Sequence, residues 1–286
     1  MGFELLPLVN RAMRAKLVRG GARSRDIVAH GHAVHLLDVP GTGSGPPLVL
    51  VHGLGSSGLT FSQIIPGLAK FSRRVLAADL PGAGFSPLPQ TPPTIEESVH
   101  LLASLYEREL GGEKALVVGN SLGGAMAAEL SFRRPELVRA LVLSAPAGAE
   151  VSPERFAALL QSFEMKSWRQ GRDFMRKLYH RAPPLVPELL AYDMLKSFGR
   201  PHVQRLLHGD RPNDHLEPSV LGGLQMPVLL LWGRSEKLLP YESIEYFRKH
   251  LPPHALIEEV ADWGHVPHLD RPRELVARLE RFARAL

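Results

Sequence analysis

The sequence contains no cysteine, so a disulfide, a thiolate nucleophile and a cysteine-ligated metal are all excluded. No run approaches the roughly 18 apolar residues that span a bilayer. The apolar stretch at residues 5–9 is broken by Pro7, so we expect no signal peptide. No Gly-x-Gly-x-x-Gly follows a predicted strand, which argues against dinucleotide binding. We therefore predict a cytoplasmic protein that needs neither a metal nor an organic cofactor.

Composition is otherwise ordinary for a globular chain of 286 residues, with 44% hydrophobic and 22% charged residues. The net charge of +5 lies entirely in residues 1–25, which hold six basic side chains and one acidic one. The other 261 residues carry 28 basic and 28 acidic side chains. Because the body is neutral, we expect no nucleic-acid partner.

The basic N-terminal arm, residues 1–24, has the pattern of an amphipathic helix. Leu5, Val9, Met13 and Leu17 recur every four residues, with basic side chains between them. Two interpretations stay open: peripheral contact with an anionic membrane through residues 1–22, or docking on the body or on a dimer partner. The oligomeric state is not predicted.

After the arm, short apolar runs of the kind found in strands alternate with helical patterns. Continuous rather than alternating hydrophobicity is typical of strands buried on both faces, as in a parallel sheet. The alternation predicts an α/β fold with a doubly wound, mostly parallel sheet. The predicted strands lie within 27–39 and at 48–51, 74–78, 115–118, 140–143, 228–232 and 255–260, and the helices at 95–110, 122–134, 242–250 and 273–286.

Residues 148–223 interrupt this alternation with helical pattern and no convincing strand. We interpret them as a helical cap inserted between two parts of the core, residues 25–147 and 224–286. The insertion is rich in aromatic residues and methionine, which suit an apolar pocket. We predict that Phe163, Met165 and Trp168 line that pocket.

The most informative motif is Gly119-Asn120-Ser121-Leu122-Gly123, which joins a predicted strand directly to a helix. Such a sharp turn holds a serine in a strained conformation and exposes its hydroxyl at the edge of the sheet. Only small neighbours fit there, which explains Gly119 and Gly123. The motif predicts Ser121 as a nucleophile.

A second strand, 48–51, ends in His52-Gly53-Leu54-Gly55 at the same edge. The backbone N–H of Leu54, with that of Leu122 after the serine, would form a two-donor oxyanion hole. We interpret His52 as a structural residue that orients this loop.

A serine needs a base, and His265 follows the last predicted strand in a Gly-His loop, with His268 as the alternative. Glu236 follows the strand at 228–232 after a glycine turn and could orient the histidine. Glu150, Asp210 and Asp214 are rival acids.

In these motifs, and in Asp79-Leu80-Pro81-Gly82-Ala83-Gly84-Phe85-Ser86, the sequence resembles the α/β-hydrolase fold family over residues 25–286. The resemblance implies a triad of Ser121, His265 and Glu236, although the family usually has aspartate as the acid. It also implies oxyanion donors at Leu54 and Leu122 and a helical cap. Asn120 is shared with members that cut carbon–carbon bonds and with ordinary esterases.

The predicted function is hydrolysis of a small-molecule carboxylic ester with an apolar acyl or alcohol group, through an acyl-enzyme. A carbon–carbon bond hydrolase acting on ring-cleavage diketone acids is the runner-up. It would need a cation for the substrate carboxylate. The candidates are the cap arginines Arg155, Arg169, Arg172, Arg176 and Arg181. Two more functions are compatible with the sequence: an acyltransferase with the same triad, and a non-catalytic binding module on a hydrolase scaffold.

Overall fold

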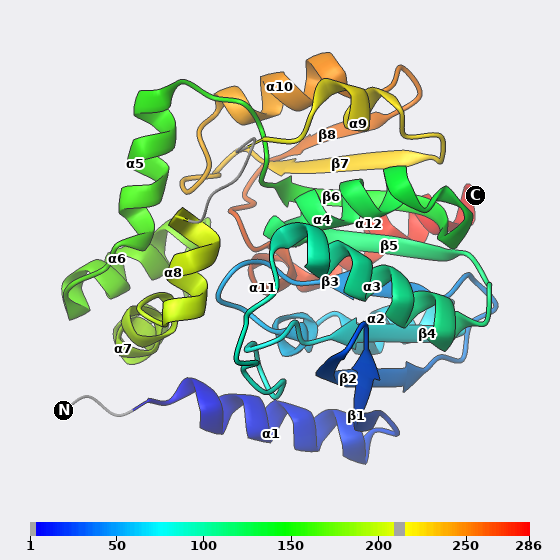
Figure 1. Ribbon diagram of the computed structural model, residues 1–286, viewed down its shortest axis with the longest axis horizontal. Helices are drawn as coiled ribbons and strands as arrows, with labels where there is room; N and C mark the ends of the chain where they lie inside the picture. The colour runs from blue at the N-terminus through cyan, green and yellow to red at the C-terminus, as the bar shows by residue number, and fades with distance from the viewer. Residues whose placement is uncertain (1–3, 209–214) are drawn as a thin grey trace.

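The computed structural model describes residues 4–208 and 215–286, in which a central sheet carries helices on both faces (Figure 1). The strands pair in the order β1-β2-β4-β3-β5-β6-β7-β8. β2 pairs antiparallel with both β1 and β4, and the other neighbouring strands are parallel. This confirms the predicted doubly wound, mostly parallel sheet. The strands are β1 Arg23–Ala29, β2 His32–Pro40, β3 Leu48–Val51, β4 Arg74–Ala78, β5 Ala115–Ser121, β6 Val138–Pro146, β7 Val228–Gly233 and β8 Leu256–Val260.

The two faces of the sheet bury separate apolar clusters. In β3, Val49 and Val51 face one cluster and Leu48 and Leu50 face the other. Burial on both faces explains why the central strands are apolar without alternation. The first face is covered by α3 (Ile95–Leu110), α4 (Leu122–Arg133) and α10 (Glu242–His250), and the second by α2 (Ile65–Phe71) and α12 (Pro272–Arg284).

Local signals fix the ends of these helices. At the start of α3, Thr94 and Glu97 form a capping box, in which each side chain accepts a hydrogen bond from the other residue's backbone N–H. Gly111 ends the same helix in a left-handed conformation with φ of 59°. α4 stops at Arg133, two residues before Pro135.

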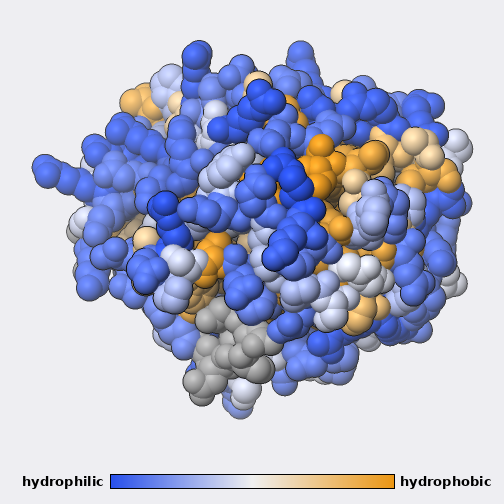
Figure 2. All heavy atoms as spheres, turned by 90° about the horizontal axis from the view of Figure 1, so that it is seen from above, coloured by the Kyte–Doolittle hydropathy of each residue, from blue (hydrophilic) through white to orange (hydrophobic). Residues whose placement is uncertain are grey.

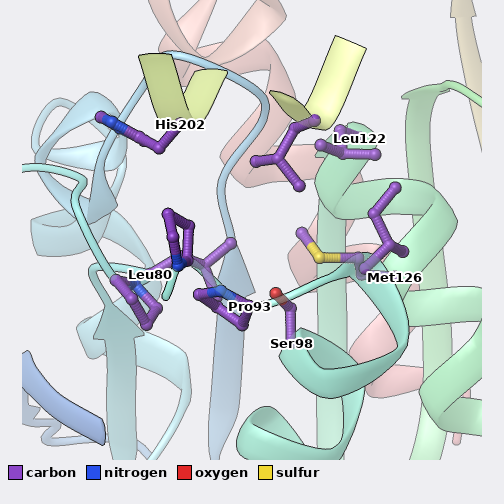
Figure 3. A pocket seen from close by; sticks show the side chains of 10 residues that line it. Leu80, Pro93, Ser98, Leu122, Met126 and His202 are labelled. Carbon is purple, nitrogen blue, oxygen red and sulfur yellow. The ribbon is translucent and has the colours of Figure 1, made fainter. Parts of the chain in front are cut away.

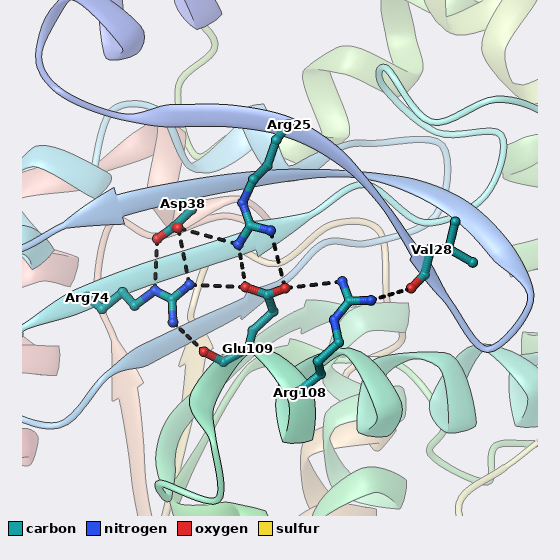
Figure 4. A network of polar contacts seen from close by, with 6 residues as sticks. All are labelled: Arg25, Val28, Asp38, Arg74, Arg108 and Glu109. Atoms are coloured by element: carbon teal, nitrogen blue, oxygen red, sulfur yellow. Dashed lines mark hydrogen bonds and ion pairs between the residues drawn. The ribbon is translucent and has the colours of Figure 1, made fainter.

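A charged network ties the antiparallel edge of the sheet to α3 (Figure 4). Arg74 of β4 contacts Asp38 of β2 at 2.9 Å and Glu109 of α3 at 3.1 Å. Arg25 of β1 pairs with both acids. The network therefore links three strands and one helix through partly buried charges.

The opposite edge, β8, is also protected by charge. Glu258 pairs with Arg278 and Arg281, and Glu259 pairs with Arg248 at 2.7 Å. Charged side chains on an edge strand discourage pairing with another sheet.

Seen from above, the molecule shows a mainly hydrophilic surface with a few apolar patches (Figure 2).

Of the five helices that the structure describes between β6 and β7, four stand beside the end of the sheet where β5 and β6 terminate (Figure 1). The short α9 (Pro218–Gly222) also falls within the predicted insertion. It packs instead on α4 and α10, with Val220 and Leu221 in the core of the first face. The inserted helices are α5 Pro153–Phe163, α6 Trp168–Leu178, α7 Val186–Phe198 and α8 Pro201–His208.

The N-terminal arm forms α1 (Leu6–Arg19), which lies along the body (Figure 1). The predicted apolar stripe faces inward: Met13 and Leu17 pack against the core, and Leu5 and Val9 are partly buried. Leu8 and Val18 lie on the outer face instead. Within residues 4–208 and 215–286, no helix is both long and apolar enough to cross a membrane.

Candidate active site

Ser121 lies at a strand-to-helix turn with no intervening residue, since β5 ends at Ser121 and α4 begins at Leu122. Its φ of 57° and ψ of −125° are strained for a residue with a side chain. A Cβ at Gly119 would collide with the carbonyl oxygen of Gly123, and one at Gly123 would collide with that of Val51. The local sequence therefore folds into this turn because both neighbours are glycine.

Glu236 and His265 form a buried pair at this end of the sheet. The His265 Nδ1 lies 2.8 Å from the Glu236 Oε2, and both side chains are at most 4% exposed. The other carboxylate oxygen, Oε1, accepts hydrogen bonds from the N–H groups of Leu238 and Leu239 at 2.7 and 3.1 Å. The carboxylate is thus held from one side by backbone and presents its second oxygen to the imidazole.

The rival residues lie elsewhere. His268 is buried beneath Phe61, with its Nε2 3.0 Å from the Thr60 hydroxyl, and burial, followed by the charge of His265, lowers the pKa of His268 to about 3. Glu150 is exposed. Asp210 and Asp214 lie outside the described residues. Of the predicted acids and bases in the described ranges, Glu236 and His265 are the two that are brought together.

Asn120 fixes the backbone of the loop after β8 that carries His265, here called the histidine loop. Its position beside Ser121 in the sequence did not reveal this role. Its Nδ2 donates to the carbonyl oxygens of Ser144 at 2.9 Å and of His265 at 3.0 Å. The bonded carbonyls are 24 and 145 residues away in the sequence. No local pattern carries that information.

The insertion also supports the histidine loop, through residues that the sequence analysis did not single out. Asp270 accepts hydrogen bonds from the N–H groups of Gly264 and His180, both at 2.8 Å. Lys237 donates to the carbonyls of Tyr179 and His180 at 3.1 Å. Burial raises the pKa of Asp270, and these backbone donors oppose that shift. The loops that carry His265 and Glu236 are therefore tied to one inserted segment.

The His52–Gly55 loop runs directly against Ser121. A Cβ at Gly53 would lie 3.1 Å from the Cβ of Ser121 and 3.6 Å from its Oγ. His52 is buried, with its Nδ1 2.9 Å from the Gly53 carbonyl, and its Nε2 accepts from the Leu80 N–H at 3.1 Å. Burial lowers the pKa of His52, so the neutral ring orients the loop. Leu122 opens α4, where N–H groups have no acceptor inside the helix.

The sequence model of the alpha/beta hydrolase fold matches residues 46–272, which include the serine turn, the His52–Gly55 loop and the Glu236–His265 pair. The chain belongs to the alpha/beta hydrolase fold family. The match covers most of the two core parts and all of the insertion between them.

This alpha/beta hydrolase is similar to enzymes of two kinds. It is 29% identical over 264 residues to the pimeloyl-[acyl-carrier protein] methyl ester esterase of Aeromonas hydrophila, covering 84% of this chain and 96% of that one. It is 28% identical over 279 residues to the 2-hydroxy-6-oxo-2,4-heptadienoate hydrolase of Pseudomonas putida, covering 91% and 96%. A bacterial membrane phospholipase A shares the fold, with a TM-score of 0.83, 23% identity and coverage of 98% and 92%.

An apolar cluster formed mainly by side chains of the inserted helices reaches the His52–Gly55 loop. Phe163 and Met165 pack against it, as does Leu54. The rings of Phe163, Phe174 and Phe198 lie with centroids 4.9–5.7 Å apart. Two of the three predicted pocket residues therefore join the cluster next to the His52–Gly55 loop, the candidate oxyanion loop.

Trp168, the third predicted pocket residue, is not part of this cluster, and its place in a pocket stays a prediction. Trp168 is 42% exposed, and its indole N–H donates to the Glu188 carbonyl at 3.3 Å. Arg172, one turn later on α6, lies over its ring. α6 turns Phe174 and Met175 inward instead. Aromatic content along the insertion does not determine the direction in which this ring points.

A small cavity adjoins Leu122 between α4, α8 and the loops before α3 (Figure 3). Leu80, Pro93, Ser98, Met126 and His202 are among its lining residues. Its volume of about 30 Å³ holds one or two water molecules rather than an acyl chain. Within the described parts of the chain, no three His, Asp or Glu side chains are grouped so that they could hold a metal ion.

Proposed function

We propose that the protein is a serine hydrolase that cleaves carboxylic esters with an apolar acyl or alcohol group. The observation that carries the proposal is the buried His265–Glu236 pair, joined at 2.8 Å, at the end of the sheet where the strained turn presents Ser121. A nucleophile at a strained turn, a histidine base and a carboxylate that orients the base are the parts that acyl transfer requires.

In the proposed mechanism, His265 accepts the proton of the Ser121 hydroxyl as the serine oxygen attacks the ester carbonyl. Glu236 holds the imidazole through Nδ1 and stabilises the positive charge that develops on it. The oxyanion lies between the N–H groups of Leu54 and Leu122. One such donor typically contributes about 2.7–4 kcal/mol of transition-state stabilisation.

His265 then donates its proton to the departing alcohol, which leaves an acyl group on Ser121. Water activated by His265 attacks this acyl-enzyme, and the carboxylic acid is released with the serine regenerated. Asn120 keeps the His265 backbone in place through both steps. Besides the ester and water, the steps use only side chains and backbone groups of this chain.

Carbon–carbon hydrolysis is the second candidate, favoured by the similarity to the Pseudomonas putida 2-hydroxy-6-oxo-2,4-heptadienoate hydrolase. Such a substrate carries a carboxylate and calls for a cationic partner in the site. Three of the cap arginines are already paired at the surface: Arg155 with Glu242, Arg172 with Asp173 and Arg176 with Glu188. Because three of the five candidate arginines pair with other side chains, we place esters first and keep carbon–carbon hydrolysis as the alternative.

The experiment is a series of p-nitrophenyl esters from acetate to palmitate, with wild type beside Ser121→Ala. We expect hydrolysis that requires Ser121 and an optimum for short to medium acyl chains. A serine-directed phosphonate that labels Ser121, without turnover of any ester, would favour a carbon–carbon bond hydrolase or an acyltransferase. Absence of both labelling and turnover would favour a non-catalytic binding module.

A further inference from the structure

The last turn of α7 rests on the candidate oxyanion loop. The Ser197 hydroxyl donates to the Gly55 carbonyl at 3.2 Å. The Phe198 ring lies so close that a Cβ at Gly55 would be 2.9 Å from it, and Gly55 has a φ of 68°. Ser197 is 9% exposed, so this contact is partly shielded from water. The turn that follows Leu54 is therefore shaped in part by a helix of the insertion.

One turn earlier, the same helix holds the N-terminus of α1. The Asp193 carboxylate, 3% exposed, accepts hydrogen bonds from the N–H groups of Leu5 at 3.1 Å and Leu6 at 2.8 Å. The first N–H groups of a helix have no internal acceptor and lie at its positive end, so a carboxylate is stabilised there. Asp193 and Ser197 are four residues apart and share one face of α7.

The rest of α1 is fixed to the core. Leu17 is buried in the second-face cluster, and the Arg14 Nε donates to the Ser24 hydroxyl at 2.6 Å. α1 thus runs from β1 to α7, two parts of the molecule that lie far apart in the sequence (Figure 1). A continuous set of contacts leads from the core through α1, Asp193 and Ser197 to Gly55.

We propose that Asp193 and Ser197 are positioning residues for the oxyanion hole, an inference that rests on the proposed function. Ser197 holds the Gly55 turn so that the Leu54 N–H keeps its place beside Ser121. Asp193 fixes the position of α7 by binding the N-terminus of α1. Oxyanion donors act only when they are set within about 2.7–3.1 Å of the developing charge, so a small displacement of this loop slows the reaction.

The test compares ester turnover by Ser197→Ala and Ser197→Thr with wild type. We expect Ser197→Ala to lower kcat roughly tenfold, less than the ~10²–10³ lost with a whole donor, while KM changes less than about twofold. The rate of Ser121 phosphonylation falls in parallel, because that reaction uses the same hole. Ser197→Thr keeps the hydroxyl and restores kcat. Ser162→Ala, which removes a partly buried hydroxyl that bonds only within the insertion, is the matched control and behaves as wild type.

Asp193 is tested in a double-mutant cycle with Ser197. Asp193→Ala lowers kcat in the wild-type background but has little further effect in Ser197→Ala, because both act through the Gly55 turn. If Asp193→Ala does not fold, Asp193→Asn, whose side chain has nearly the same shape, is used in its place. Asp173→Asn is the matched surface control.

The outcomes separate the inference from the function on which it rests. Wild type without Ser121-dependent turnover would overturn the proposed function, and the inference with it. Wild-type turnover through Ser121, with unchanged kcat in Ser197→Ala and Asp193→Ala, would overturn the inference alone. A lower melting temperature with unchanged kcat would assign these residues to stability only. Additive losses in the cycle would overturn the coupling between them.

Discussion

Asn120 and His265 are joined by a hydrogen bond of 3.0 Å from the Asn120 amide to the His265 carbonyl. Because Asn120 immediately precedes Ser121, this bond sets the histidine loop against the serine turn. The same amide also binds Ser144 on the neighbouring strand. A single buried side chain thus ties β5, β6 and the loop after β8 together at the site.

Replacing Asn120 by alanine should therefore reduce both activity and stability. Two buried carbonyls would lose their hydrogen-bond donor. Leaving a buried polar group unsatisfied lowers the free energy of unfolding by about 1–3 kcal/mol. We expect kcat to fall about tenfold as the His265 loop loosens. Urea denaturation and ester kinetics measure the two effects. Wild-type kcat in a destabilised variant would show that the bond serves folding alone.

Glu236→Gln should lower kcat by about 10³–10⁴ with little change in fold. The backbone donors of Leu238 and Leu239 require an acceptor, so the amide oxygen must take the Oε1 position. The amide NH₂ then faces His265 Nδ1 and forces the proton to Nε2, where the ring cannot accept the serine proton. Glu236→Asp is the control, since it keeps the charge. Similar kcat values for the glutamine variant and wild type would contradict the role assigned to Glu236.

His268 should make the protein less stable in acid. Its pKa is about 3 in the folded protein, lowered by burial, against about 6.5 when unfolded. The unfolded chain therefore binds more protons below pH 6.5, and stability is lost as the pH falls from there toward 3. Lowering the pH from 7.5 to 5 therefore reduces the free energy of unfolding by about 2 kcal/mol through His268.

His268→Gln keeps a partner for Thr60 but does not titrate in this range. Its free energy of unfolding should fall less than that of wild type between these two pH values. Urea denaturation of both proteins at pH 7.5 and 5 measures the difference. Parallel losses in the two proteins would mean that other groups account for the acid sensitivity.

Membrane contact through residues 1–22 stays a prediction and now depends on the outer face of α1. The stripe of Leu5, Val9, Met13 and Leu17 faces the body, which leaves Leu8 and Val18 exposed among basic side chains. We expect weak binding to anionic vesicles that salt abolishes and that Leu8→Asp with Val18→Asp removes. Sedimentation with anionic and neutral vesicles measures this. No binding to anionic vesicles at low salt would contradict the prediction.

Local pattern was sufficient for the sheet and for most helices around it. Apolar strands bounded by glycine and proline, and the helical patterns between them, specify elements without reference to the rest of the chain. The serine turn was predictable for the same reason, because Gly119 and Gly123 are needed at fixed offsets from Ser121.

Features that depend on distant packing were not predictable. The bonds from Asn120 to His265, from Ser197 to Gly55 and from α1 to Asp193 join residues more than 140 positions apart. The outward direction of Trp168 follows from how α6 and α7 pack, and its aromatic character carries no information on that.

The most direct test of the account is mass spectrometry of the protein quenched during turnover of a p-nitrophenyl ester. The account predicts a burst of p-nitrophenol and an acyl group on the peptide that contains Ser121, both absent from Ser121→Ala. Steady hydrolysis with no acylated Ser121, or equal hydrolysis by Ser121→Ala, would contradict it.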